Sequence, residues 1–208
     1  MVVLRCKVAI VGEATVGKSA MVQMFHTNGA SFPKNYLMTQ GVDFCVKEVA
    51  VPDTDATVEL YIFDISGQQI YSRIVDQYVQ DKAKTPGAAP EPTAVSVLEN
   101  TSFCALVYDV TNKDSFDRCT KWLEMCRKYR KNMNAILVGN KADLTDRQVV
   151  SAVMGEGYAR GQGLEFFQIS SLQKSEVETP FNHIAQAYHK LYEAKLKALK
   201  DEDVIVMN

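Results

Sequence analysis

The chain has 208 residues, 47% of them apolar, and a formal net charge of −2 at pH 7. This length and apolar content fit one domain with a single sizeable hydrophobic core. The nearly balanced charge argues against bulk electrostatic attraction to nucleic acid or to an anionic membrane surface.

The five cysteines are scattered, odd in number and never spaced as a CxxC pair. This distribution implies neither a disulfide framework nor a zinc site, and it fits a reducing compartment such as the cytoplasm. No cysteine lies beyond Cys126, so we expect no C-terminal prenylation, and Val2 replaces the glycine that N-myristoylation requires. The N-terminal apolar stretch is too short and interrupted to span a membrane. We therefore expect no direct lipid anchor.

Strand-like and helix-like segments alternate along the chain. We expect six strands, at 4–11, 42–51, 58–64, 103–110, 135–138 and 165–170. We expect five helices, at 20–25, 69–80, 115–131, 149–160 and 180–199. The second and third strands are close enough to form a hairpin, which would add one antiparallel strand. The alternation predicts a single α/β domain over 1–200, with a mostly parallel six-stranded sheet flanked by helices and a tail at 201–208.

The segment Gly12–Ser19 reads GEATVGKS and matches the phosphate-binding pattern GxxxxGK[ST]. It lies between an expected strand and an expected helix, which is the context that the motif requires. Its backbone N–H groups and the helix N-terminus would face phosphates, Lys18 would supply a cation to the outer phosphates, and the Ser19 hydroxyl would coordinate Mg²⁺. The motif alone does not choose between ATP and GTP. The candidate phosphate-binding residues are Gly12, Thr15, Val16, Gly17, Lys18, Ser19 and Ala20.

Asn140-Lys141-Ala142-Asp143 follows the fifth expected strand, at the edge where open α/β sheets bind ligands. The Asp143 carboxylate can accept hydrogen bonds from the ring N–H and the exocyclic amine of guanine, a donor pair that adenine lacks. Lys141 can lie along the base, and Asn140 can tie this loop to the phosphate loop. The pattern is weak alone, but together with the upstream phosphate loop it predicts guanine specificity.

The segment Asp64-Ile65-Ser66-Gly67-Gln68 ends the third expected strand. Asp64 is placed to hold Mg²⁺, Gly67 to offer its N–H to a γ-phosphate, and Gln68 to orient an attacking water as the catalytic residue. Thr39 is a candidate Mg²⁺ ligand when a γ-phosphate is present, and losing that contact would release its loop. The alternative for Thr39 is an ordinary residue at the start of a strand.

These segments, in this order, resemble the Ras superfamily, and its Rab branch most. TQGVDF at 39–44 is similar to the Rab switch I signature, DISGQQ at 64–69 to the Rab pattern DTAGQE, and LVYDVTNKDSF at 106–116 is also Rab-like. FFQISSL at 166–172 is similar to the last nucleotide loop of the family. The resemblance covers nearly the whole chain and implies GTP or GDP and Mg²⁺ as ligands, and GTP hydrolysis as the activity.

The resemblance also implies further contacts with the base. Ser170, Ser171 and Leu172 would form the loop at the guanine carbonyl, and Phe32 would pack against the base. The predicted metal ligands are Ser19, Thr39 and Asp64.

The segments LRCKVAIVGEATVGKSAMVQMF, YLMTQGVDF and VPDTDATVEL are similar to the Rab-like GTPase subunit of the intraflagellar transport B complex. That subfamily lacks prenylated terminal cysteines, as this chain does. The resemblance implies a heterodimer with a small β-sandwich transport subunit, membership of a larger transport complex, and a location in the cytoplasm, the cilium or flagellum and the basal body.

The chain departs from the family pattern at several positions. Ala14 replaces a frequent glycine and would crowd Gln68 or an incoming arginine. Ser66 and Gln69 alter the surface of switch II, and Leu172 replaces a lysine near the base. The stretch 81–97 is an insertion relative to ordinary Rab proteins, and its prolines and small residues predict a surface loop in its first half.

Two functions stay open on these patterns. No arginine occurs between Arg5 and Arg73, so switch I supplies no arginine finger and intrinsic GTP hydrolysis should be slow. The first function is a slowly hydrolysing switch. The second is an adaptor subunit in which bound GTP mainly stabilises the fold. A further alternative is a Rab-like switch that acts in vesicle traffic rather than in the transport complex. A P-loop nucleoside kinase would leave NKAD and DISGQ unexplained.

Overall fold

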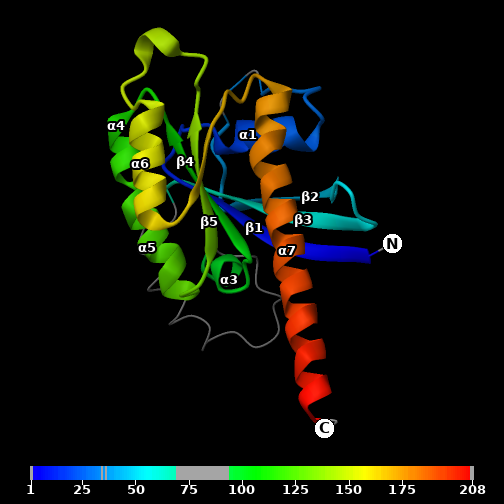
Figure 1. Ribbon diagram of the computed structural model, residues 1–208. Coiled ribbons are helices and arrows are strands. Elements are labelled where there is room, and N and C mark those ends of the chain that lie inside the picture. The colour runs from blue at the N-terminus through cyan, green and yellow to red at the C-terminus, as the bar shows by residue number, and fades with distance from the viewer. Residues whose placement is uncertain (1, 34, 36, 69–93, 207–208) are drawn as a thin grey trace, which may run out of the picture.

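The computed structural model describes residues 2–33, 35, 37–68 and 94–206. Within these ranges six strands form one sheet, in the order β2-β3-β1-β4-β5-β6 (Figure 1). β2 runs antiparallel to β3, and every other neighbouring pair is parallel. The predicted α/β architecture and its hairpin are therefore confirmed. The strands are β1 (Val2–Val11), β2 (Val42–Ala50), β3 (Ala56–Ile65), β4 (Phe103–Asp109), β5 (Asn134–Asn140) and β6 (Glu165–Gln168).

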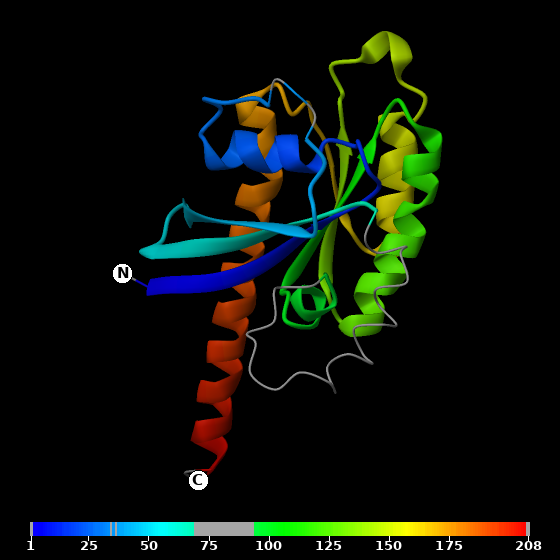
Figure 2. The same ribbon diagram turned by 180° about the vertical axis from the view of Figure 1, so that it is seen from behind.

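Helices cover both faces of this sheet. The helices are α1 (Lys18–His26), α3 (Ala94–Glu99), α4 (Lys113–Asp117), α5 (Cys119–Tyr129), α6 (Ala152–Gln162) and α7 (Lys174–Val206), with a 3-10 turn η1 (Thr145–Arg147). α1 and α7 lie on one face, and α4, α5 and α6 lie on the other, as the view from behind also shows (Figure 2).

The central strand β4 shows how the sheet joins the two layers. All seven of its residues are buried. Ala105 and Val107 pack into the core under α1 and α7, whereas Cys104 and Leu106 pack into the core under α4, α5 and α6. A parallel strand covered on both faces is apolar over nearly its whole length, and in β4 only the last residue, Asp109, is charged. This requirement explains why the most continuous apolar run of the chain is the middle strand.

Helix α7 is longer than expected at both ends. The sequence predicted a helix that starts at Pro180, but the helix begins at Lys174 and carries Pro180 inside it. Val177 and Phe181 are both fully buried, one turn apart on the face that meets the sheet, and this burial carries the helix through the proline. The expected tail is helical as far as Val206, so α7 extends beyond the sheet (Figure 1). Within the described ranges, none of the helices combines the length and apolar character that crossing a membrane requires.

Three other elements differ from expectation. The helix expected at 115–131 is divided at Arg118 into α4 and α5. The end of the expected insertion is helical, since α3 begins at Ala94, and it packs under α5 through Val97 and Leu98. The helix expected at 69–80 and most of the insertion at 81–97 lie outside the described residues.

Replacing Phe181 by alanine should lower the free energy of unfolding by about 3–5 kcal/mol, because a buried aromatic ring leaves a cavity. The ring is 1% exposed and stacks on Phe25 with centroids 4.0 Å apart. Urea unfolding at a fixed GDP concentration measures the change. Leu199→Ala is the control, because Leu199 lies on the same helix and is 58% exposed; it should change the stability by less than about 0.5 kcal/mol. Equal losses for the two variants would show that α7 does not dock through Phe181.

Candidate nucleotide-binding site

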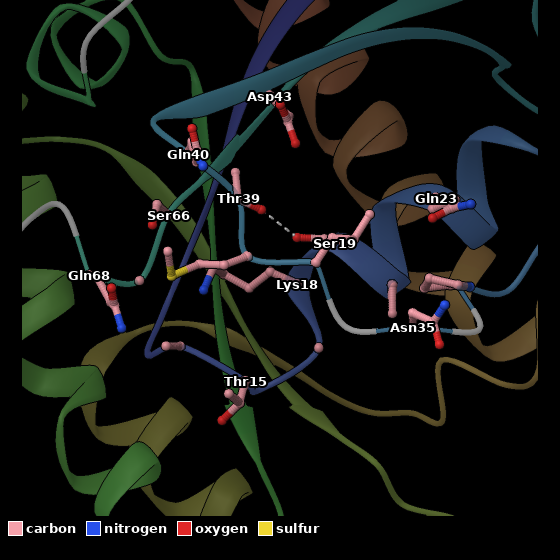
Figure 3. A pocket seen from close by; sticks show the side chains of 17 residues that line it. Thr15, Lys18, Ser19, Gln23, Asn35, Thr39, Gln40, Asp43, Ser66 and Gln68 are labelled. Carbon is pink, nitrogen blue, oxygen red and sulfur yellow. Dashed lines mark hydrogen bonds between the residues drawn. The ribbon is translucent and has the colours of Figure 1, made fainter.

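The candidate site lies at the carboxyl ends of the parallel strands, where the loops after β1, β3, β5 and β6 meet (Figure 1). A cavity of about 470 Å³ opens there. It is lined by the loop after β1, the first turn of α1, the segment before β2 and the end of β3 (Figure 3). The sequence predicted this edge, and the geometry brings its separate segments to one place.

The phosphate loop is held in a conformation that requires glycine at two positions. Gly12 has φ of +143° and Gly17 has φ of +96°, and Thr15 between them also has positive φ, at +67°. A Cβ atom at Gly12 would lie 2.1 Å from the carbonyl oxygen of Val107, and one at Gly17 would lie 2.3 Å from Nδ2 of Asn140. The two glycines of the motif therefore let the loop curl tightly against β4 and β5.

Lys18 supplies the buried cation of this loop. Its side chain is 6% exposed, and Nζ donates hydrogen bonds to the carbonyl oxygens of Gly12 at 2.9 Å and Glu13 at 2.8 Å. Burial lowers the pKa of Lys18 to about 8, although the nearby carboxylates of Asp64 and Glu13 oppose this shift. The Lys18 side chain lines the cavity, where an anionic ligand would replace the solvation that the ammonium group has lost (Figure 3).

Three oxygen-bearing side chains converge beside Lys18. The hydroxyl oxygen of Ser19 lies 2.9 Å from that of Thr39 (Figure 3). The Ser19 hydroxyl also donates to Oδ2 of Asp64 at 2.5 Å. The Thr39 hydroxyl donates to the same carboxylate oxygen at 3.3 Å. These are the residues predicted as metal ligands. Ser19 comes from α1, Thr39 from the segment before β2, and Asp64 from β3.

This set of oxygens fits Mg²⁺. Asp64 is 2% exposed, and its second oxygen, Oδ1, is buried without a hydrogen-bond partner. Burial raises the pKa of Asp64, against the opposing effect of the Ser19 hydrogen bond and the Lys18 charge. A hard divalent cation that takes carboxylate, hydroxyl and water oxygens would stabilise the charged form of this carboxylate. Among the described residues no cluster of three His, Cys, Asp or Glu side chains offers another metal site.

Asn140 joins the cavity to the loops beyond it. The side chain is fully buried, and Nδ2 donates to the carbonyl oxygen of Val16 at 2.9 Å. Oδ1 accepts hydrogen bonds from the Ser171 N–H at 3.1 Å and from its hydroxyl at 2.8 Å. One side chain therefore connects the loops after β1, β5 and β6, as the sequence predicted for the contact with the phosphate loop.

Asp143 is held by a neighbouring hydroxyl. Oδ1 of Asp143 accepts from the Ser170 hydroxyl at 2.5 Å, while the side chain itself is exposed. Lys141 has φ of +65° and pairs with Asp109, Nζ to Oδ2, at 2.6 Å. Burial would raise the pKa of Asp109, but hydrogen bonds from Lys141 and Thr111 outweigh it and lower the pKa. The loop after β5 thus presents the Asp143 carboxylate to solvent while Ser170 holds its orientation.

A model of the Ras family matches residues 7–85 and 92–190 of the chain. The chain belongs to the Ras family. Members of this family generally bind GTP or GDP with Mg²⁺ and hydrolyse GTP. The phosphate loop, the three oxygen-bearing side chains and the loop after β5 lie within the matched residues.

Relatives of two kinds are similar to the chain. An intraflagellar transport protein 27 homolog of Trypanosoma brucei brucei is 42% identical over 96% of this chain and 98% of its own length. The homolog of Bos taurus is 40% identical with the same coverage. The Ras-related protein Rab-11B of Dictyostelium discoideum is more distant, at 29% identity over 93% of this chain and 79% of its own length. The similarity to the intraflagellar transport protein 27 homologs extends over nearly the full length of this chain and of each relative.

Some predicted site residues lie apart from the cavity walls. Phe32 and Leu172 are 42% and 53% exposed, and neither lines the cavity. Gln68 is exposed and lies at the cavity rim beside Gly67 (Figure 3). A Cβ atom at Gly67 would lie 2.3 Å from the backbone nitrogen of Ala14. The phosphate loop and the end of β3 are therefore in close contact at that glycine. The roles of these residues toward a nucleotide stay predictions.

Sequence reasoning missed a second set of contacts in the phosphate loop. The Glu13 carboxylate accepts a hydrogen bond from the Trp122 indole and pairs with Arg118. Trp122 is 1% exposed and belongs to the core, but its indole N–H points at this loop. More than one hundred residues separate the partners, and no local pattern links them.

Replacing Asp143 by asparagine should remove most of the preference for GDP over IDP, which lacks the 2-amino group. Asparagine keeps a carbonyl oxygen for Ser170 but no longer offers a carboxylate to the base. We expect a preference of about tenfold or more in the unmodified protein and a ratio near one in the variant. Competition with a fluorescent GDP analogue measures both affinities. Asp146→Asn, in the exposed turn η1, is the control. A variant that still prefers GDP to the same extent would refute the role of Asp143 as base reader.

Proposed function

We propose that this chain is a guanine-nucleotide switch that hydrolyses GTP slowly and acts as a subunit in intraflagellar transport. The observation that carries the switch proposal is the convergence of Ser19, Thr39 and Asp64. Thr39 lies 20 residues after Ser19 in the chain, yet its hydroxyl is within 2.9 Å of Ser19 and 3.3 Å of Asp64. A structural role for Thr39 as a strand-start residue would not require this contact.

The segment around Thr39 has the properties of a releasable element. Its neighbours Leu37 and Met38 are 83% and 49% exposed, so few apolar contacts hold the segment in place. Mg²⁺ bound by Ser19, Thr39 and Asp64 would neutralise phosphate charge and add the attraction that fixes the segment. Once the γ-phosphate left, Thr39 would lose its contact with Mg²⁺, and the segment would be released.

Slow hydrolysis follows from what surrounds Gln68. Gln68 lies at the cavity rim and is the candidate for orienting the attacking water. The segment between Arg5 and Arg73 carries no arginine, so the switch I segment supplies no cation to the transition state. Ala14, in close contact with Gly67, reduces the room for an arginine from another protein. The missing arginine favours a low intrinsic rate, and Ala14 would also limit stimulation by an arginine from another protein.

The transport part of the proposal rests on relatives whose names denote intraflagellar transport proteins, at 36–42% identity over nearly the full chain. We propose membership of a larger transport complex, a heterodimer with a small β-sandwich subunit, and a location in the cytoplasm, cilium or flagellum and basal body. The alternatives are an adaptor with negligible hydrolysis, in which GTP mainly stabilises the fold, and a Rab-like switch in vesicle traffic.

Replacing Gln68 by leucine should lower the single-turnover rate of GTP hydrolysis by roughly tenfold to a hundredfold, because leucine cannot orient water. Rapid quenching of preloaded protein measures the rate. Gln186→Leu, the same substitution on α7 far along the chain from the cavity, should leave it unchanged. An unchanged rate in Gln68→Leu would assign the residue no catalytic role and would favour the adaptor.

The whole proposal is tested by loading the protein with GDP or with a non-hydrolysable GTP analogue and recovering partners from an extract of ciliated or flagellated cells. A stoichiometric small partner recovered with both nucleotides indicates a constitutive transport subunit, and additional partners seen only with the GTP analogue indicate switching. Ser19→Asn, which removes the Mg²⁺-binding hydroxyl, should lose only the second group. Recovery of vesicle-traffic proteins alone, and only with the GTP analogue, would overturn the transport proposal.

A further inference from the structure

Glu13 is a carboxylate built into the phosphate loop whose side chain turns away from the cavity. Its Oε1 accepts a hydrogen bond from Nε1 of Trp122 at 3.0 Å, and its Oε2 pairs with Nη1 of Arg118 at 3.4 Å. Trp122 is 1% exposed and the Glu13 side chain is 21% exposed, so the bond between them is partly shielded from water, whereas the Arg118 side chain is 51% exposed. A charge-assisted hydrogen bond in such surroundings is stronger than a neutral one on the surface.

The backbone of Glu13 contacts the two groups that would face the phosphates. Its carbonyl oxygen accepts the 2.8 Å hydrogen bond from Nζ of Lys18. On the other side, a Cβ atom at Gly67 would lie 2.5 Å from the carbonyl carbon of Glu13 and 2.3 Å from the nitrogen of Ala14. The peptide between Glu13 and Ala14 is therefore confined between Lys18 and Gly67. A small rotation of this peptide would move both.

The partners of the Glu13 carboxylate belong to a rigid part of the fold. Arg118 lies at the junction of α4 and α5, and Trp122 is one turn into α5. α5 packs against the sheet through buried Leu123 and Cys126. The carboxylate thus connects the phosphate loop to a helix whose place is set by the core.

We propose that Glu13 is a positioning residue of the phosphate loop, which holds Lys18 and Gly67 in register through its bonds to Trp122 and Arg118 and thereby slows the release of bound nucleotide. The proposal rests on the proposed guanine-nucleotide binding. Residues that touch a ligand directly need outer partners to fix their geometry, and losing such a partner weakens binding without removing a contact. Base selection, which depends on the loop after β5, is unaffected.

The test measures the dissociation rate of a fluorescent GDP analogue from the Mg²⁺-loaded protein. Glu13→Gln, which keeps shape and one acceptor, should raise the rate about threefold, and Glu13→Ala should raise it about tenfold. The matched control is Glu59→Gln. Glu59 likewise accepts from an arginine and an aromatic residue, Arg5 Nε at 3.1 Å and the Tyr61 hydroxyl at 3.2 Å, but it lies on β3 away from the loop. This control should leave the rate unchanged.

A second readout separates positioning from a general loss of stability. Trp122→Phe keeps an aromatic ring in the core and removes only the N–H donor, so it should raise the dissociation rate in the unmodified background. In the Glu13→Ala background it should have no further effect, because the acceptor is already gone. Trp122 is the only tryptophan of the chain, so its fluorescence reports this contact directly. Glu13→Gln should shift the emission of the GDP-bound protein, and Glu59→Gln should not.

The outcomes are distinct for the two proposals. An unmodified protein that retains no guanine nucleotide overturns both. An unmodified protein that retains GDP, together with Glu13 variants whose rates match that of Glu59→Gln, overturns the positioning role alone. Additive effects of Glu13→Ala and Trp122→Phe on the rate also overturn it, because they would mean that the two side chains act independently.

Discussion

The fully buried amide of Asn140 is the interaction on which the site depends. It accepts and donates at the same time, so three loops from different parts of the chain have to keep one relative position. An unmet hydrogen-bonding group at this depth would cost free energy, which makes the arrangement close to all-or-none. The missing Cβ of Gly17 provides the space in which the amide lies. A single side chain therefore fixes the position of the phosphate loop relative to the loops after β5 and β6.

Charge is distributed in the site in alternating layers. Lys18 is buried between the backbone of its own loop and Asp64, and it has lost enough solvation for its pKa to fall to about 8. Burial disfavours the charged form of Asp64 as well and therefore raises its pKa, and its Oδ1 has no hydrogen-bond partner. A ligand that carries anionic oxygens and a divalent cation would stabilise both groups in their charged forms. Glu13 adds an outer layer, where a carboxylate engaged by α5 holds the peptide that Lys18 contacts.

The fold and much of the site could be predicted because parallel α/β sheets translate sequence order into position. A motif that follows a strand has to lie at the carboxyl edge of the sheet, so the ends of β1, β3 and β5 were expected to meet. The convergence of Ser19, Thr39 and Asp64 agrees with that expectation. Element boundaries were less predictable. The burial of Val177 and Phe181 carries α7 through a proline that local rules treat as a start.

The sequence by itself determined the alternation of strands and helices, the phosphate loop and the candidate residues for metal and base, because each depends on residues close together in the chain. Only the tertiary structure decided which distant side chains support them. The bonds of Glu13 to Arg118 and Trp122 span 105 and 109 residues, and that of Asn140 to Val16 spans 124. Such contacts arise from the packing of whole helices on the sheet. No local spacing encodes them, since packing depends on the summed burial of both cores.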